Sequence, residues 1–156
     1  MKKILSLVAS LTAICAVCAG VLAYVNKITK GPIAETAEKA KEAARLAVLC
    51  GEEGYAAEGR SGEGYGGDIV LMVGFTPDYK IVSYRKLEAA ETPGLGANLT
   101  TEGFMKQFSG MDASSPIAVR KDGGNVEAIT SATITSRAVC GAINNAKNKL
   151  EGLLKK

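Results

Sequence analysis

The sequence predicts an α+β protein: an N-terminal transmembrane helix followed by a small antiparallel-sheet domain with flanking helices. Three observations predict this fold. An apolar stretch without charges opens the chain, short strand-like runs between turn residues fill its middle, and a long helical pattern closes it. The chain of 156 residues has room for one domain after that stretch. We therefore expect an anchor at residues 1–27 and a single domain at residues 28–156.

The apolar stretch runs from Ile4 to Val25 and follows Lys2 and Lys3. As a helix it is long enough to cross roughly 30 Å of hydrocarbon, in contact with membrane lipid. A cleaved signal peptide is the alternative, but its apolar core is usually about 7 to 15 residues long. Lysines lie on both sides of the stretch and do not fix its orientation. We expect an uncleaved single-pass anchor in the cytoplasmic membrane, with the domain on the extracytoplasmic side.

The composition excludes several classes of function. The chain contains no histidine, which excludes a Ser-His-Asp triad and a histidine-ligated zinc ion. Its net charge is only +3, and acidic and basic residues are interspersed, so we expect no nucleic-acid partner. We assign no catalytic residue and no metal ligand, and chemistry must come from other groups or from a cofactor.

The elements of the first half follow the apolar stretch in order. Ala, Glu and Lys at helical spacing predict a helix over Ile33–Cys50. The glycine-rich stretch Gly51–Gly67 is weakly hydrophobic and predicts a loop or an irregular crossover. Two strand-like runs, Asp68–Phe75 and Tyr79–Leu87, are separated by the turn signal Thr76-Pro77-Asp78 and predict an antiparallel hairpin.

The second half is predicted to contain a loop, a short helix, a second hairpin and a long helix. These elements are, in order, the loop Glu91–Gly96, the helix Thr101–Phe108, the strands Pro116–Lys121 and Asn125–Ile129 joined by Asp122-Gly123-Gly124, and the helix Thr133–Leu154.

The four cysteines do not form a disulfide framework. Cys15 and Cys18 lie inside the apolar stretch, where small apolar helix residues are a better interpretation than a redox pair. Cys50 and Cys140 lie in the domain. They could form a disulfide in an oxidising compartment, or remain as free thiols, and the sequence leaves both open.

Small hydroxyl residues mark the point where the last predicted strand gives way to the long helix. The amides and partial positive charge of a helix N-terminus favour an anion such as phosphate. The hydroxyls that could donate to it belong to Thr130, Ser131, Thr133, Thr135 and Ser136. Ordinary helix capping explains the same composition equally well.

Three other features receive interpretations from the residues alone. Phe104 and Phe108 are four apart on a short helix and are expected in the core. Tyr65 lies among glycines and is expected in a turn before a strand rather than against a flat ring. Arg137 could face the anion or simply solvate a surface, and both remain open.

The segment Glu127-Ala128-Ile129-Thr130-Ser131-Ala132-Thr133 resembles the covalent flavinylation motif of the FMN-binding domain family. That motif is an acidic residue, two spacers, Ser or Thr, a small residue and then Ala-Thr. In the family a flavin transferase joins the FMN phosphate to the threonine hydroxyl. The resemblance implies covalent FMN on Thr133, with Thr130, Ser131 and Ala132 completing the motif.

A second segment carries the same resemblance. Glu91-Thr92-Pro93-Gly94-Leu95-Gly96 is similar to the loop that the family places against the flavin. The resemblance implies that Glu91, Thr92, Gly94 and Leu95 contact the cofactor.

The sequence also departs from the family's pattern. Glu127 stands where Asp is usual, Ser131 where Gly is common, and Ala89 where we expect a histidine. The region between Leu46 and Gly64 is shorter than in typical relatives.

Nearly the whole chain resembles the G subunit of the Rnf ion-translocating complexes, and it is similar to the C subunit of the sodium-pumping NADH:quinone reductase. The resemblance implies an extracytoplasmic electron-relay subunit rather than a complete enzyme, in a complex that couples ferredoxin and NAD to Na⁺ or H⁺ movement. Its partners would be other subunits and a flavin transferase. A free-standing membrane-tethered electron carrier and a non-flavinylated scaffold module remain as alternatives.

Overall fold

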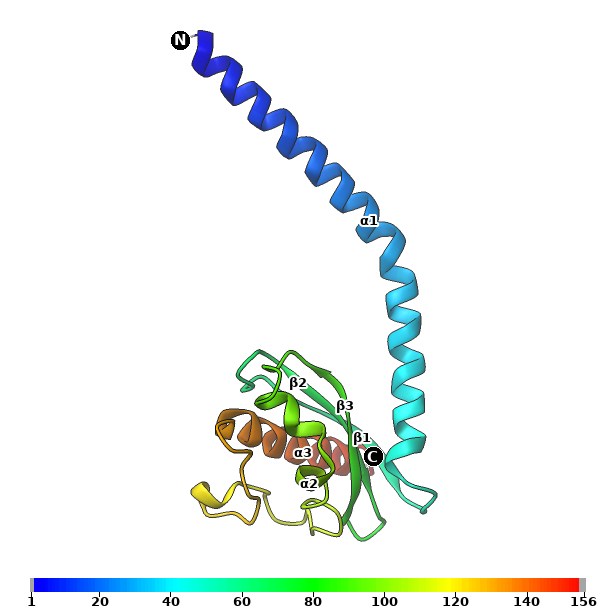
Figure 1. The fold of residues 1–156 in the computed structure, drawn as a ribbon. Helices are drawn as coiled ribbons and strands as arrows, with labels where there is room; N and C mark the ends of the chain where they lie inside the picture. The colour runs from blue at the N-terminus through cyan, green and yellow to red at the C-terminus, as the bar shows by residue number, and fades with distance from the viewer. Residues whose placement is uncertain (1, 155–156) are drawn as a thin grey trace. The chain divides into compact units, whose positions relative to one another are not determined.

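The computed structural model describes residues 2–154. By its internal contacts the chain divides into two compact units, one ending at Lys39 and the other beginning at Ala40. Helix α1 (Lys2–Val48) runs through the first unit and enters the second (Figure 1). The helix predicted from Ile33 is thus the last part of one continuous helix, because Pro32 lies inside α1 without ending it.

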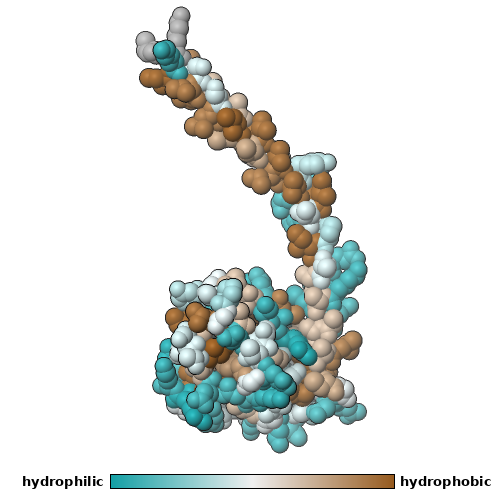
Figure 2. Space-filling view, in the orientation of Figure 1, coloured by the Kyte–Doolittle hydropathy of each residue, from teal (hydrophilic) through white to brown (hydrophobic). Residues whose placement is uncertain are grey.

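The N-terminal part of α1 is apolar and exposed. Its large side chains between Ile4 and Val25 are all accessible, and Figure 2 shows this hydrophobic surface along the helix. By length and composition, α1 can cross a membrane. This agrees with the predicted membrane segment.

A three-stranded antiparallel sheet forms the centre of the second unit. Its strands are β1 (Tyr55–Ser61), β2 (Ile69–Phe75) and β3 (Ile81–Ala89), in the spatial order β1-β2-β3 (Figure 1). The hairpin predicted from the sequence is β2 and β3, which confirms that expectation. Every residue of the central strand β2 is buried.

Strand β1 was not predicted, and the expectation of a loop over Gly51–Gly67 is wrong. The residues of β1 that point inward are the small residues Ala57, Gly59 and Ser61, which give little hydrophobic signal. Their size is required because helix α3 (Thr133–Leu154) approaches closely. A Cβ atom on Gly59 would lie 1.9 Å from the carbonyl oxygen of Ala142.

Helix α3 has the predicted bounds and packs against the sheet, mainly against β1. Phe108 lies in the same core and makes edge-to-face contacts with Tyr84 and Phe104, with ring centroids 5.5 and 5.4 Å apart. The expectation that Phe104 and Phe108 belong to the core is confirmed. The Tyr84 hydroxyl donates a hydrogen bond to the Leu99 carbonyl, and burial raises the pKa of Tyr84.

The cysteines of the domain are free thiols. Cys50 is exposed, whereas Cys140 is buried on α3, and burial raises the pKa of its thiol to about 12. The open question of a Cys50–Cys140 disulfide is therefore answered in favour of two separate thiols.

Short helical turns follow the sheet. The 3₁₀ helix η1 (Gly96–Thr100) is followed by the short helix α2 (Glu102–Met105), which covers part of the helix predicted over Thr101–Phe108. Because α2 has a single turn, the expected element is present but shorter.

The hairpin predicted over Pro116–Lys121 and Asn125–Ile129 is wrong. This stretch contains a 3₁₀ helix, η2 (Arg120–Asp122), and one isolated bridge between Val119 and Val126. Apolar residues still alternate along it, and Val119 and Val126 are buried. The alternation indicates burial of one face, but it does not show whether a neighbouring strand is present.

Side-chain amides replace the neighbouring strand. Asn144 on α3 accepts a hydrogen bond from the Ile117 N–H and donates one to the Ile117 carbonyl, both at 2.9 Å. Gln107 does the same for Glu127, at 2.8 and 3.2 Å. We call such a pair of bonds an amide clip. The two clips satisfy backbone groups that a sheet would otherwise pair.

Candidate functional site

A cavity of about 440 Å³ lies where the loop after β3 meets the beginning of α3. Its lining comes from the turn before β2, from that loop, and from the junction that leads into α3. The lining residues are Tyr65, Glu91, Thr92, Leu95, Gly96, Ser131, Ala132, Thr133, Ile134 and Thr135. Its size and mixed lining suit a small organic ligand.

The carboxylate of Glu91 joins the three segments of this wall. Its Oε2 atom accepts a hydrogen bond from the Thr135 hydroxyl at 2.7 Å, and its Oε1 atom accepts one from the Gly66 N–H at 3.2 Å. Gly96 lies against the same group, since a Cβ there would be 2.3 Å from Glu91 Oε2. Glu91 therefore holds the Tyr65-Gly66 turn and the first turn of α3 to its own loop.

The chain enters α3 through a left-handed residue. Ser131 has a φ of 61°, the Ala132 N–H donates to the Ile129 carbonyl, and the Ser136 N–H donates to the Ala132 carbonyl. The amides of the first helical turn thus have no acceptor within the helix. Glycine adopts a left-handed backbone conformation without a steric penalty. This is a physical reason why Gly is common at the position of the motif that Ser131 occupies.

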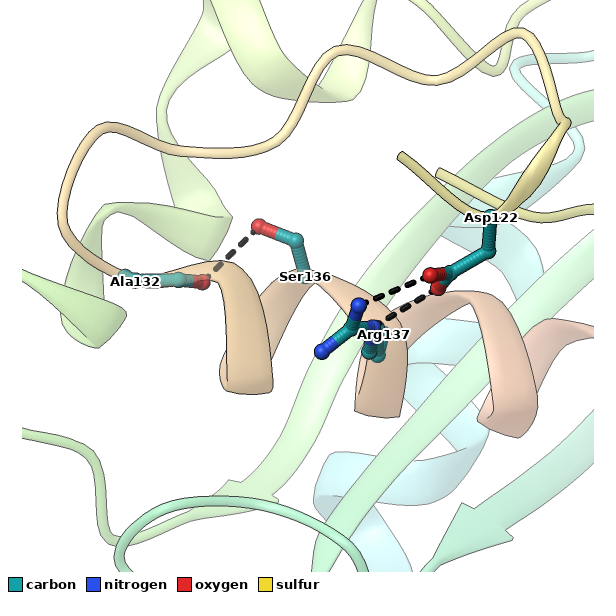
Figure 3. Close-up of polar contacts among 4 residues, drawn as sticks. All are labelled: Asp122, Ala132, Ser136 and Arg137. Carbon is teal, nitrogen blue, oxygen red and sulfur yellow. Dashed lines mark hydrogen bonds and ion pairs between the residues drawn. The ribbon is translucent and has the colours of Figure 1, made fainter. Parts of the chain in front are cut away.

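Two of the hydroxyls that we expected to face an anion do not do so. Thr135 and Ser136 are 1% and 0% exposed. The Thr135 hydroxyl donates to Glu91. The Ser136 hydroxyl donates to the Ala132 carbonyl (Figure 3). It also accepts a hydrogen bond from the Ile129 N–H. Their hydrogen bonds build the junction, so for these two residues the structure favours the structural alternative that the sequence left open. Thr133 is half-buried in the cavity wall.

Six of the eight residues predicted to bind the cofactor line this cavity. They are Glu91, Thr92, Leu95, Ser131, Ala132 and Thr133. The other two, Gly94 and Thr130, line an adjoining depression of about 550 Å³ together with Leu95 and Ser131. The two predicted segments, distant in sequence, are therefore neighbours in space.

Tyr65 lies in the turn before β2, as the sequence predicted, and it also lines the cavity. Its side chain is 70% exposed and forms part of the wall. The detectable signal is a single aromatic residue among Gly64, Gly66 and Gly67, where a purely structural turn has no need of a ring.

Basic residues lie on the other side of Thr133. Arg120 and Lys121 line a depression of about 290 Å³ whose wall also contains Thr133. Arg120 forms an ion pair with Glu127 at 3.5 Å. The wall of this depression therefore carries two cations and the Glu127 carboxylate, and its net positive charge favours an anionic group beside Thr133.

Arg137 is engaged in a different contact. Its Nε and NH2 atoms donate to the two carboxylate oxygens of Asp122, each at 2.7 Å (Figure 3). These bonds lower the pKa of Asp122 and raise the pKa of Arg137. Arg137 thus attaches η2 to α3, which answers the question that the sequence left open.

A model of the FMN-binding domain family matches residues 64–148, more than half of the chain, and includes every residue of the cavity. The chain belongs to the FMN-binding domain family. A second family model, for the RnfG N-terminal region, matches residues 1–48. The resemblance inferred from the two motifs is confirmed.

Curated relatives agree with this assignment. The G subunit of the proton-translocating ferredoxin:NAD(+) oxidoreductase complex of Clostridium ljungdahlii is 41% identical over 86 residues, covering 54% of this chain and 46% of the relative. The G subunit of the ion-translocating oxidoreductase complex of Pasteurella multocida is 41% identical over 106 residues, covering 64% and 51%. The G subunit of the corresponding complex of Methanosarcina acetivorans is 39% identical over 94 residues, covering 60% and 49%. The chain spans about half the length of the curated relatives it matches.

The cavity fits the cofactor for which the family is named. FMN combines a flat, largely apolar ring with a phosphate. Tyr65, Leu95 and Ile134 supply apolar and aromatic wall, and the first turn of α3 supplies amide donors for an anion.

Proposed function

We propose that this chain is an electron-transfer flavoprotein subunit of a membrane ion-translocating oxidoreductase complex of the Rnf type, with FMN joined covalently to Thr133. One observation carries the proposal. The two segments that resemble the family's flavin loop and flavinylation motif meet in a single cavity, with Thr133 in its wall.

Residues on two sides of Thr133 would hold the cofactor. The first-turn amides of α3, with Arg120 and Lys121 nearby, suit the phosphate. Tyr65 and Leu95 suit the ring. Bound FMN supplies the redox chemistry, while the protein supplies placement and electrostatics.

The covalent step is a phosphoryl-group transfer. A bond forms between Thr133 Oγ1 and the FMN phosphorus, and a bond to that phosphorus must break. Flavin adenine dinucleotide is a suitable donor, because its pyrophosphate linkage breaks and AMP leaves. The threonine proton passes to a base of the flavin transferase. The product is a phosphoester that denaturation does not remove.

We place residues 1–27 in the cytoplasmic membrane and residues 28–156 on its extracytoplasmic side. The proposal is supported by the apolar part of α1 and by the match of residues 1–48 to the RnfG N-terminal region. The partners would be membrane lipid, a flavin transferase and the other subunits of the complex. The names of the relatives support the last of these.

The apolar part of α1 also suits a second candidate, a stand-alone membrane-tethered flavoprotein that passes electrons to an extracytoplasmic acceptor. Copurification of the full chain with other subunits of a redox complex would exclude this candidate, whereas isolation as a yellow monomer would favour it.

The covalent linkage is tested by mass spectrometry of the full chain after co-expression with a flavin transferase and denaturation. We expect an added mass of one FMN less water on the peptide that contains Thr133. Thr133→Ala should abolish it with little effect on folding, because alanine is well tolerated in a helix. Thr100→Ala, an exposed threonine outside both motifs, should retain it. An unmodified wild-type chain would contradict the covalent proposal and favour the scaffold alternative.

A further inference from the structure

Gln107 holds the first residue of the flavinylation motif through its backbone. The Glu127 N–H donates to Gln107 Oε1 at 2.8 Å, and Gln107 Nε2 donates to the Glu127 carbonyl at 3.2 Å. Both backbone groups of Glu127 are thus bound by one side chain. Gln107 follows α2, so this clip joins the motif to a different part of the fold.

The rest of the motif is fixed from its other end. Ser136 on α3 accepts a hydrogen bond from the Ile129 N–H at 2.9 Å, and the Ile129 carbonyl accepts one from Ala132 at 2.9 Å. The motif is therefore restrained at Glu127 and again at Ile129. Thr130 is exposed between this restraint and Thr133.

The clip leaves the side chain of Glu127 accessible. Because Gln107 binds only the backbone, the carboxylate is directed outward and is 70% exposed, with Arg120 3.5 Å away. A depression of about 550 Å³ lies beside the motif, and its wall contains Gln107 as well as residues 127–131. A partner protein can therefore reach the acidic residue and the exposed hydroxyls from the same side.

We propose that Gln107 is a positioning residue for the modification of Thr133. It presents residues 127–131 in one conformation, with Glu127 accessible, to the transferase that must read them. This inference rests on the proposed function and extends it to a residue outside both motifs. Gln107 takes no part in the group transfer itself.

Loss of the Gln107 clip should leave the backbone of Glu127 free in the unbound protein, so that the transferase must order it on binding. Ordering the backbone of one residue on binding costs about 1–2 kcal/mol, which corresponds to roughly a five- to thirty-fold change in an equilibrium. The loss should fall on recognition rather than chemistry. It should therefore raise the KM for the acceptor protein and leave kcat nearly unchanged.

The test uses the full chain in detergent as the acceptor, with purified flavin transferase and flavin adenine dinucleotide, and follows the mass increase. Gln107→Met keeps the length of the side chain but removes both hydrogen bonds, whereas Gln107→Glu keeps the acceptor. The matched control is Asn144→Leu, which removes the other clip, at Ile117. Hydrogen exchange at the Glu127 amide reports on the clip without any flavin.

We expect Gln107→Met to lower kcat/KM by roughly five- to thirty-fold through KM and to accelerate exchange at Glu127, with an intermediate effect for Gln107→Glu. Asn144→Leu should be modified at the wild-type rate while it remains folded by circular dichroism. Wild-type kinetics in Gln107→Met would overturn the inference and leave the covalent proposal intact, as would an equal loss in both clip variants. A wild-type chain no better modified than Thr133→Ala would instead overturn the proposed function, and the inference with it.

Discussion

The sheet with α3 and the segment of residues 114–131 are held by different interactions. The sheet and α3 share a continuous apolar core, in which β2 is buried along its whole length. The segment is fixed by two amide clips, an isolated bridge and the exposed Arg137–Asp122 ion pair. The first region is stabilised mainly by buried area. The second combines the burial of Ile117, Val119 and Val126 in the same core with a few directional bonds that hold its exposed residues.

The two regions also differ in their proposed roles, one in forming the cavity and the other in recognition by a modifying enzyme. The core fixes Glu91 and the first turn of α3, which form most of the cavity wall. The segment carries Glu127 and Thr130, which a modifying enzyme would have to reach. At Glu127 a side-chain clip takes the place of a neighbouring strand, so the backbone is held while the side chain remains accessible.

Substitution of Gly59 should have the largest effect on stability. Gly59→Ala places a Cβ 1.9 Å from the Ala142 carbonyl oxygen, a backbone atom that cannot rotate away. We expect the free energy of unfolding to fall by about 3 kcal/mol, in the range found for overpacked cores. Urea denaturation followed by circular dichroism measures it. Gly62→Ala is the control, because its Cβ would meet its nearest atom, Asp68 Oδ1, at 3.4 Å. Equal stability of the two variants would contradict close packing of α3 on β1.

Glu91 connects the core to the cavity, and its substitution should have an intermediate effect. Glu91→Ala leaves the buried Thr135 hydroxyl and the Gly66 N–H without their acceptor. We expect a loss of about 1–2 kcal/mol and a changed environment for bound FMN, read from its absorption spectrum and midpoint potential. Glu88→Ala, at an exposed position of β3, should change neither quantity. A spectrum unaffected by Glu91→Ala would argue against a flavin ring beside the Tyr65 turn.

The Asp122–Arg137 pair should have the smallest effect, because exposed ion pairs contribute little. Arg137 lowers the pKa of Asp122, so the pair stabilises the native state above the ordinary aspartate pKa of about 3.9. That contribution is lost as the pH falls through the lowered pKa. Thermal unfolding of Asp122→Asn should thus differ slightly from wild type at pH 7 and converge with it in acid. Asp78→Asn controls for loss of a surface charge, and a difference that persists in acid would contradict this assignment.

Helices and strands with a clear pattern in their own local sequence were predictable. The ends of α3 agree with the helix predicted over Thr133–Leu154, because its apolar positions recur at helical spacing and a junction of small hydroxyl residues precedes it. The hairpin of β2 and β3 follows from two apolar runs around a proline turn. Strand β1 escaped prediction because close packing against α3 requires small residues, and these carry the composition of a loop.

The sequence by itself determined the apolar membrane segment, the antiparallel hairpin, the last helix and the two motifs, because each depends on residues that are close together in the chain. Tertiary structure alone decided which residues meet. It placed Glu91 between Gly66 and Thr135, replaced a predicted hairpin by the clips of Gln107 and Asn144, and buried two hydroxyls that composition suggested for an anion. These outcomes depend on contacts between distant segments. A side-chain amide can satisfy the hydrogen bonds of a backbone as well as a neighbouring strand can. A local sequence pattern therefore cannot distinguish a stretch paired with a strand from one held by side chains.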